Sequence, residues 1–211
     1  MAIDDLLDEH EQGEIVRGWL RENGVALIGG VVLGLALIWG WQWWQQQRVV
    51  KRMQGGNEYQ AALNDLAAGK IDQAKPRIAA LPSGAFDTLG TLALAKAQIE
   101  AGKRDDAIAT LRAAKPVEPA MKAIVEQRLA RLLIDAGKAK DAIAVLANLG
   151  DQAETLQIRG DAHAALGQDE QARAAYAKAL ISMEVGSPQR NLVELKLSEV
   201  GGEPTKTGAG N

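Results

Sequence analysis

GKRDDAIATL, residues 102–111, is one of four copies of a pattern in this 211-residue chain. The other copies are GKIDQAKPRI at residues 69–78, GKAKDAIAVL at residues 137–146 and GQDEQARAAY at residues 167–176. Each copy begins with glycine, has alanine five residues later and a large apolar residue nine residues later. The glycines are 33, 35 and 30 residues apart, so the chain is built from units of similar length.

A period near 34 residues with this internal pattern is typical of tetratricopeptide repeats, in which two helices form one unit. The glycine ends the first helix, and the small alanine lets the second helix pack closely. One unit cannot bury its own apolar face, so neighbouring units stack into a solenoid. The sequence SPQRNLVELKLSEV predicts a last helix that covers the final unit, with Ser187 as its cap and Pro188 in its first turn.

An apolar segment precedes the repeats. No residue between Glu22 and Arg48 carries a charge. Residues 25–44 would form a helix of about 30 Å, which matches the hydrocarbon core of a bilayer. The segment ends in tryptophans that suit an interfacial aromatic belt, namely Trp39, Trp41, Trp43 and Trp44. The sequence therefore predicts an all-α protein with a single N-terminal transmembrane helix followed by a tetratricopeptide-repeat-like α-solenoid.

Two other interpretations of the apolar segment are a buried helix of a soluble domain and a cleaved signal peptide. Buried helices of this length without a charge are uncommon. A signal peptide has a basic start, an apolar run of about 7–15 residues and a small-residue cleavage site, and this segment fits none of these. Within the predicted anchor, Gly30 and Gly34 form a GxxxG pair that would let another membrane helix approach closely.

Charge is distributed unevenly about the anchor. Seven acidic and two basic residues precede it, a charge of −5, whereas the chain that follows carries +2. Neither value is typical of a nucleic-acid-binding protein, so no nucleic acid is expected as a partner. The few basic residues that flank the anchor leave its orientation open. The predicted layout is an acidic head (1–22), the anchor (23–47), the solenoid with its capping helix (48–200) and a disordered tail (201–211).

The composition argues against an enzyme. The chain has no cysteine, and its two histidines, His10 and His163, lie in different regions. These residues supply no thiolate nucleophile and no metal-ligating cluster. The Gly-Lys pairs of the repeats lack the remainder of a phosphate-binding loop. We therefore expect no catalytic residues, no metal and no cofactor.

The concave face of a repeat solenoid is its usual binding surface. The repeat pattern places six residues of two successive first helices on this face: Leu92, Lys96, Ile99, Gln127, Arg131 and Ile134. There, Lys96 and Arg131 would hold a carboxylate of an extended peptide. The alternative is that both cations are solvated or paired within the chain, for example with Asp161.

From end to end the chain resembles the YfgM-like family, the ancillary subunits of the bacterial SecYEG translocon. The resemblance rests on RENGVALIGGVVLGLALIWGWQWW at residues 21–44, QRLARLLIDAGK at 127–138 and IRGDAHAALGQDEQARAAYAKAL at 158–180. It covers nearly the whole chain, and the order of anchor and repeats adds to its specificity.

The resemblance implies an inner-membrane protein with its amino end in the cytoplasm and its repeats in the periplasm. Its partners would be the translocon, a membrane-anchored periplasmic chaperone related to peptidyl-prolyl isomerases, emerging polypeptides, and the lipid bilayer around the anchor. The family has no catalytic residues to transfer to this chain. Two alternatives stay open: a scaffold of another cell-envelope assembly or division complex, and a membrane-tethered cytoplasmic adaptor.

Overall fold

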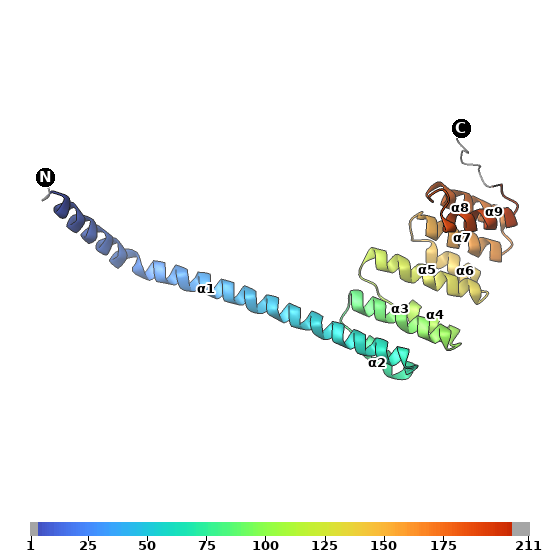
Figure 1. Cartoon of the computed structure of the whole chain (residues 1–211), viewed down its shortest axis with the longest axis horizontal. Coiled ribbons are helices and arrows are strands. Elements are labelled where there is room, and N and C mark those ends of the chain that lie inside the picture. Colours follow the sequence, from blue (N-terminus) through green and yellow to red (C-terminus); the bar gives the residue numbers. More distant parts are fainter. Residues whose placement is uncertain (1–3, 204–211) are drawn as a thin grey trace, which may run out of the picture. The chain divides into compact units, whose positions relative to one another are not determined.

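A computed structural model describes the backbone of residues 4–203 and the side chains of residues 17–48 and 53–203. Over residues 4–203 the chain is helical and has no strand, which confirms the predicted all-α fold class (Figure 1). The helices are α1 (Asp4–Ala67), α2 (Ile71–Ala79), α3 (Ala85–Glu100), α4 (Arg104–Ala113), α5 (Pro119–Asp135), α6 (Ala139–Leu146), α7 (Ala153–Ala165), α8 (Asp169–Ile181) and α9 (Pro188–Glu199). The chain divides into two compact units, residues 1–54 and residues 55–211, and each is considered by itself.

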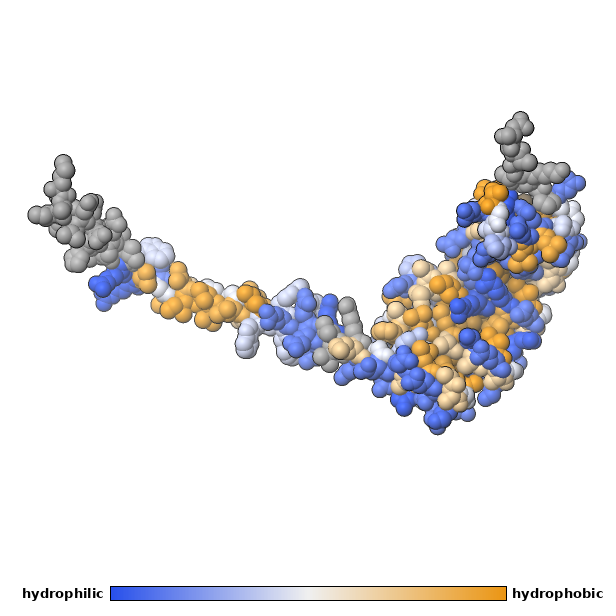
Figure 2. Space-filling view, viewed as in Figure 1, coloured by the Kyte–Doolittle hydropathy of each residue, from blue (hydrophilic) through white to orange (hydrophobic). Residues whose placement is uncertain are grey.

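Residues 4–54 of α1 lie in the first unit, and α1 extends past both ends of the predicted anchor and continues into the second unit. Its most apolar window has a mean hydropathy of 2.0, and none of that window is buried. Figure 2 shows this window as an orange band along the helix. Among the described residues, α1 is the one helix that by length and composition can cross a membrane, as predicted. Exposed apolar side chains on all sides of a helix are typical of contact with lipid.

The tryptophans at the end of the apolar segment lie close to a cation. The Trp41 and Trp44 ring centroids are 5.3 Å apart, and Arg48 Cζ lies 3.5 Å from the centroid of a Trp44 ring. Amphipathic rings followed by a charge suit the boundary between lipid and water. The side chains of residues 1–16, which hold most acids of the predicted head, and residues 204–211 of the predicted tail lie outside the described residues.

The second unit is a stack of helix pairs. Helices that are consecutive in sequence pack against each other from α2 to α9, and α5 also contacts α7. Figure 1 shows α3 and α4, α5 and α6, and α7 and α8 following one another along the stack. Ser187 caps α9 as predicted, because its side chain accepts a hydrogen bond from the backbone N–H of Arg190 at 3.3 Å. The contact of α9 with α8 covers the final pair.

The four repeat glycines end the first helix of each pair, as predicted. Gly69, Gly102, Gly137 and Gly167 have φ between 69° and 74°, where glycine is favoured because it has no Cβ. At Gly102 the N–H donates to the Ile99 carbonyl at 2.9 Å, and the N–H of Lys103 donates to the Gln98 carbonyl at 2.7 Å. This pair of bonds is the Schellman arrangement, which satisfies the last carbonyls of a helix.

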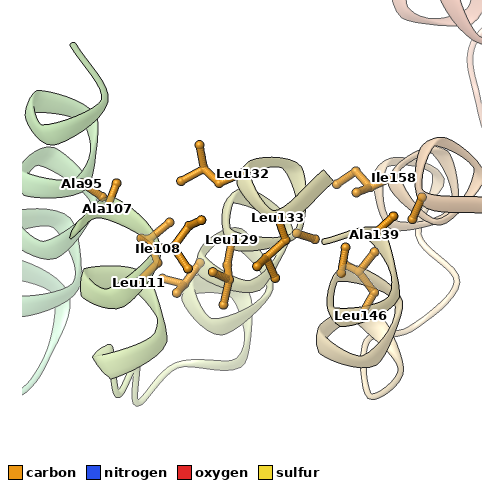
Figure 3. Packing of buried hydrophobic residues seen from close by; sticks show 14 of the residues in the cluster. Ala95, Ala107, Ile108, Leu111, Leu129, Leu132, Leu133, Ala139, Leu146 and Ile158 are labelled. Carbon is orange, nitrogen blue, oxygen red and sulfur yellow. The ribbon is translucent and has the colours of Figure 1, made fainter. Parts of the chain in front are cut away.

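The repeat alanines lie in the core of the stack. The four alanines five residues after the glycines are fully buried, namely Ala74, Ala107, Ala142 and Ala172. The large apolar residues nine after the glycines are at most 4% exposed, namely Ile78, Leu111, Leu146 and Tyr176. Figure 3 shows how α3 to α7 contribute to one core, in which Leu111 and Leu129 lie between α4 and α5. Burial of these side chains against neighbouring pairs therefore stabilises the stack.

Candidate partner-binding surface

The structure separates the six predicted groove residues into buried and exposed members. Leu92 and Gln127 are each 5% exposed, so the prediction that they face a partner is wrong. Leu92 belongs to the main core, and Gln127 Nε2 donates a hydrogen bond to Thr155 Oγ1 of α7 at 3.0 Å. Both residues lie ten positions before the glycine that ends their helix, and the bond of Gln127 shows that this position of α5 faces α7 rather than the groove.

Lys96 is exposed and Arg131 is half-buried, and each has a carboxylate partner in the chain. Lys96 Nζ lies 3.6 Å from Glu100 Oε1, and Arg131 Nη2 lies 2.7 Å from Glu154 Oε1. The two cationic side chains are 73% and 43% exposed, so both ion pairs are weak and leave the cations accessible to a competing anion. The partner of Arg131 is therefore Glu154, and not the Asp161 given as an example from the sequence.

The two predicted isoleucines differ in exposure. Ile99 is 42% exposed, whereas Ile134 is partly buried against the main core. Two further apolar side chains belong to the exposed face and were missed from the sequence, Leu89 at 39% and Ile124 at 38% exposure. Each lies seven residues before the cation of its helix. Seven residues return a helix to within about 20° of the same direction, whereas four residues turn it by about 40°. The seven-residue spacing from each cation could therefore have identified Leu89 and Ile124 from the sequence.

We define the inner face as Leu89, Lys96, Ile99, Ile124 and Arg131. At one end of it, Arg131 borders a hollow of about 520 Å³ that Glu154, Met183 and Leu192 also line. This hollow brings α5, α7 and the beginning of α9 together around the Arg131 guanidinium. The inner face thus combines apolar side chains with two accessible cations, a combination suited to an extended polypeptide with a carboxylate.

Helix α7 has an acid at the position where α3 and α5 have cations. Asp161, like Lys96 and Arg131, lies six residues before the helix-ending glycine. Its carboxylate accepts from Tyr176 Oη at 2.8 Å and from Lys196 Nζ of α9 at 2.8 and 2.9 Å. Burial, then the hydrogen bond to Asp161, raises the pKa of Tyr176 well above its usual range, so the phenol keeps its proton and donates. Asp161 therefore holds α9 against α7 through Lys196 and does not belong to the exposed face that carries Lys96 and Arg131.

The remaining predicted features have no functional partner in the described part of the chain. A Cβ on Gly30 or Gly34 would meet nothing within 4 Å, so a helix contact there stays a prediction. His163 Nδ1 is 2.7 Å from Gln168 Oε1, a local hydrogen bond, whereas the side chain of His10 lies outside the described residues. Among the described side chains, no three histidines or acids are grouped to hold a metal ion.

Comparison with known proteins identifies relatives of this chain. The family model described as a tetratricopeptide repeat-like domain matches residues 17–202. The chain is also 28% identical over 200 residues to the ancillary SecYEG translocon subunit of Escherichia coli strain K12. That alignment covers 92% of this chain and 97% of the relative, so both the apolar helix and the repeats are included.

Proposed function

The chain belongs to the tetratricopeptide repeat-like family as a YfgM-like member, and on that premise we propose that it is a non-enzymatic, membrane-anchored ancillary subunit of the SecYEG translocon. The observation that carries this proposal is the length of the alignment, which includes 97% of the translocon subunit. A shared repeat alone would support only a shared fold. An apolar helix and the repeats in the same order support the same membrane-anchored role.

The proposed arrangement puts the amino end in the cytoplasm and the solenoid in the periplasm. Two basic residues precede the anchor closely and three follow it, so the charge count slightly favours the opposite orientation. The difference is small, and long domains cross membranes largely regardless of charge. The solenoid would then stand where secreted chains leave the translocon. Its proposed partners are these emerging polypeptides and a membrane-anchored periplasmic chaperone related to peptidyl-prolyl isomerases.

A single-cysteine experiment tests the orientation, because the chain has no cysteine of its own. Lys140 is exposed on α6, and Gly18 is exposed in α1 ahead of the apolar segment. In cells with a permeable outer membrane, we expect a membrane-impermeant maleimide to label the Lys140→Cys variant before lysis. The Gly18→Cys variant should react only after the inner membrane is broken. The reverse pattern would make the chain a cytoplasmic adaptor and would exclude the periplasmic partners.

Co-purification tests the partners and the inner face together. From mild detergent, the full-length chain should bring translocon subunits with it. We expect the double variant Lys96→Glu and Arg131→Glu to lose most of the periplasmic chaperone or client protein, because the charges of two accessible cations are reversed. Lys140→Glu, an exposed cation outside the inner face, is the matched control.

The outcome also separates the translocon from the alternative scaffold. Recovery of cell-envelope assembly or division proteins without translocon subunits would favour a scaffold of another complex. Equal recovery of all partners by the folded inner-face variant and by Lys140→Glu would remove the inner face as the binding surface. Translocon subunits retained by both variants would place that contact elsewhere, for example on the anchor.

A further inference from the structure

Arg159 of α7 donates hydrogen bonds to backbone carbonyls at the end of α6, the second helix of the preceding pair. From α7 its Nη2 donates to the Leu146 carbonyl at 2.9 Å and to the Leu149 carbonyl at 2.6 Å, at the end of α6. Its Nη1 donates to Asp151 Oδ1 at 2.7 Å. The last carbonyls of a helix have no donor within that helix, and the guanidinium supplies one. Arg190 of α9 donates in the same way to the Leu180 carbonyl at 2.7 Å.

One pair earlier, the equivalent place has no arginine. Leu129 of α5 stands eight residues before its helix-ending glycine, as Arg159 does. The corresponding carbonyls belong to Leu111 and Ala114. The turns match, because the Ala114 N–H donates to the Leu111 carbonyl at 3.3 Å just as the Leu149 N–H donates to the Leu146 carbonyl at 3.0 Å. The end of α4 therefore repeats the backbone acceptors that Arg159 satisfies at the end of α6.

A hollow of about 490 Å³ lies at this place, between α4, α5 and α6, and we call it the α5 hollow. Its apolar lining includes Leu111, Val125 and Leu129, and Ala114 and Glu126 also border it. Glu126 Oε2 is buried and lacks a hydrogen-bond partner among the side chains and backbone described. A buried carboxylate oxygen without a donor is costly. Glu126 borders the α5 hollow, and a donor that enters the hollow would satisfy its carboxylate once the side chain turns Oε2 toward that donor.

Three cations border the mouth of the α5 hollow. Arg112 Nη2 is already 3.0 Å from Asp141 Oδ2, and Lys122 Nζ is 3.7 Å from Glu126 Oε1, while Lys115 also lines the mouth. The side chains of Arg112 and Lys122 are 50% and 52% exposed, so water and salt screen them. The Glu126 side chain is 23% exposed and is therefore less screened, so among the charged residues that border the hollow it is the one that would attract a donor.

We propose that the α5 hollow binds an arginine side chain of an extended partner polypeptide. This arginine would occupy the place at the end of α4 that Arg159 of the chain itself occupies at the end of α6. The stem of the arginine would lie on Leu111, Val125 and Leu129, and its guanidinium would donate to Glu126 and the Ala114 carbonyl. Two neighbouring hollows of about 540 and 420 Å³ continue the surface, one sharing Pro116 and the other sharing Lys115 with it. This continuation fits a segment on both sides of the arginine.

Labelled peptides test the proposal on the full-length protein in detergent micelles. The first probe is acetyl-Gly-Val-Gly-Arg-Gly-Val-Gly-amide, and the second has citrulline, an uncharged isostere, in place of arginine. Fluorescence anisotropy should give the arginine peptide a Kd about tenfold lower, since a charge-assisted donor is lost with citrulline. Equal affinities would overturn the proposal, and so would tighter binding of the same peptide with glutamate in place of arginine.

Protein variants locate the binding. Glu126→Gln should abolish the preference for arginine over citrulline, whereas the exposed Glu170→Gln should keep it. Leu129→Arg copies Arg159 and should close the hollow from within, so that both peptides bind alike. An unchanged preference in the Glu126→Gln variant would contradict the assigned site. These peptides test a surface separate from the inner face, so their result neither supports nor contradicts the proposed translocon function.

Discussion

Gly160→Ala is expected to destabilise the solenoid by about 3 kcal/mol, although it replaces a helical glycine by the best helix former. A Cβ on Gly160 would lie 2.9 Å from Tyr176 Cζ, and closer still to two other carbons of the same ring. The backbone of Gly160 has ordinary negative φ, so helix propensity alone would favour alanine by about 1 kcal/mol. The sign of the effect therefore reports the contact between α7 and α8.

Tyr176 is not free to move out of the way. It is 2% exposed, and its hydroxyl is bonded to Asp161, which Lys196 also holds. Relief of the overlap would require α7 and α8 to separate or the network to α9 to break. Unfolding in denaturant, followed by far-UV circular dichroism, measures the loss. Hydrogen exchange should become faster in α7, α8 and α9 before it does so in α3.

Gly90→Ala is the matched control for Gly160→Ala. There a Cβ would meet Ile78 Cγ2 and Leu81 Cδ1 at 3.2 Å, a much smaller overlap that a shift of a few tenths of an ångström relieves. We expect a loss of less than about 1.5 kcal/mol. In a Tyr176→Leu background the cost of Gly160→Ala should largely disappear, since the ring is gone. A Gly160→Ala protein as stable as the parent would show that the contact is not tight.

Arg190→Met is expected to cost about 3 kcal/mol and to loosen α9 from the stack. Arg190 is 5% exposed, and its Nη1 donates to the carbonyls of Leu180 at 2.7 Å and Met183 at 3.2 Å. Its Nε donates to Glu194 Oε1 at 2.8 Å. Methionine replaces the apolar stem, but it leaves these acceptors, one of them charged, without the guanidinium donors.

The loss from Arg190→Met should be local. Hydrogen exchange should rise in α9 and at the end of α8, while α3 and α4 keep their protection. Arg112→Met is the control, because Arg112 is 50% exposed and paired with an exposed Asp141, an interaction worth less than about 1 kcal/mol. If Arg190→Met proves no more costly than Arg112→Met in denaturant unfolding, the carbonyls of α8 do not depend on this side chain.

The features of this protein that depend on local chemistry were predictable from its sequence. Helix ends at Gly69, Gly102, Gly137 and Gly167 were predictable because positive φ is a property of one residue and its neighbours. The buried alanines followed from the same repeat. The apolar helix was predictable because its exposed side chains depend on no tertiary partner, only on length and the absence of charge.

The direction of each side chain around a helix depended on the tertiary stack. Leu92 was expected on the open face and is buried, because a shift of about 40° around α3 separates the groove from the core. The partner of Arg131 and the hydrogen bonds of Arg159 join residues from different helices. The α5 hollow likewise arises because α4, α5 and α6 leave a space that leucine, unlike arginine, does not fill. Such features depend on how whole helices pack against one another, and no single stretch of the sequence contains that information.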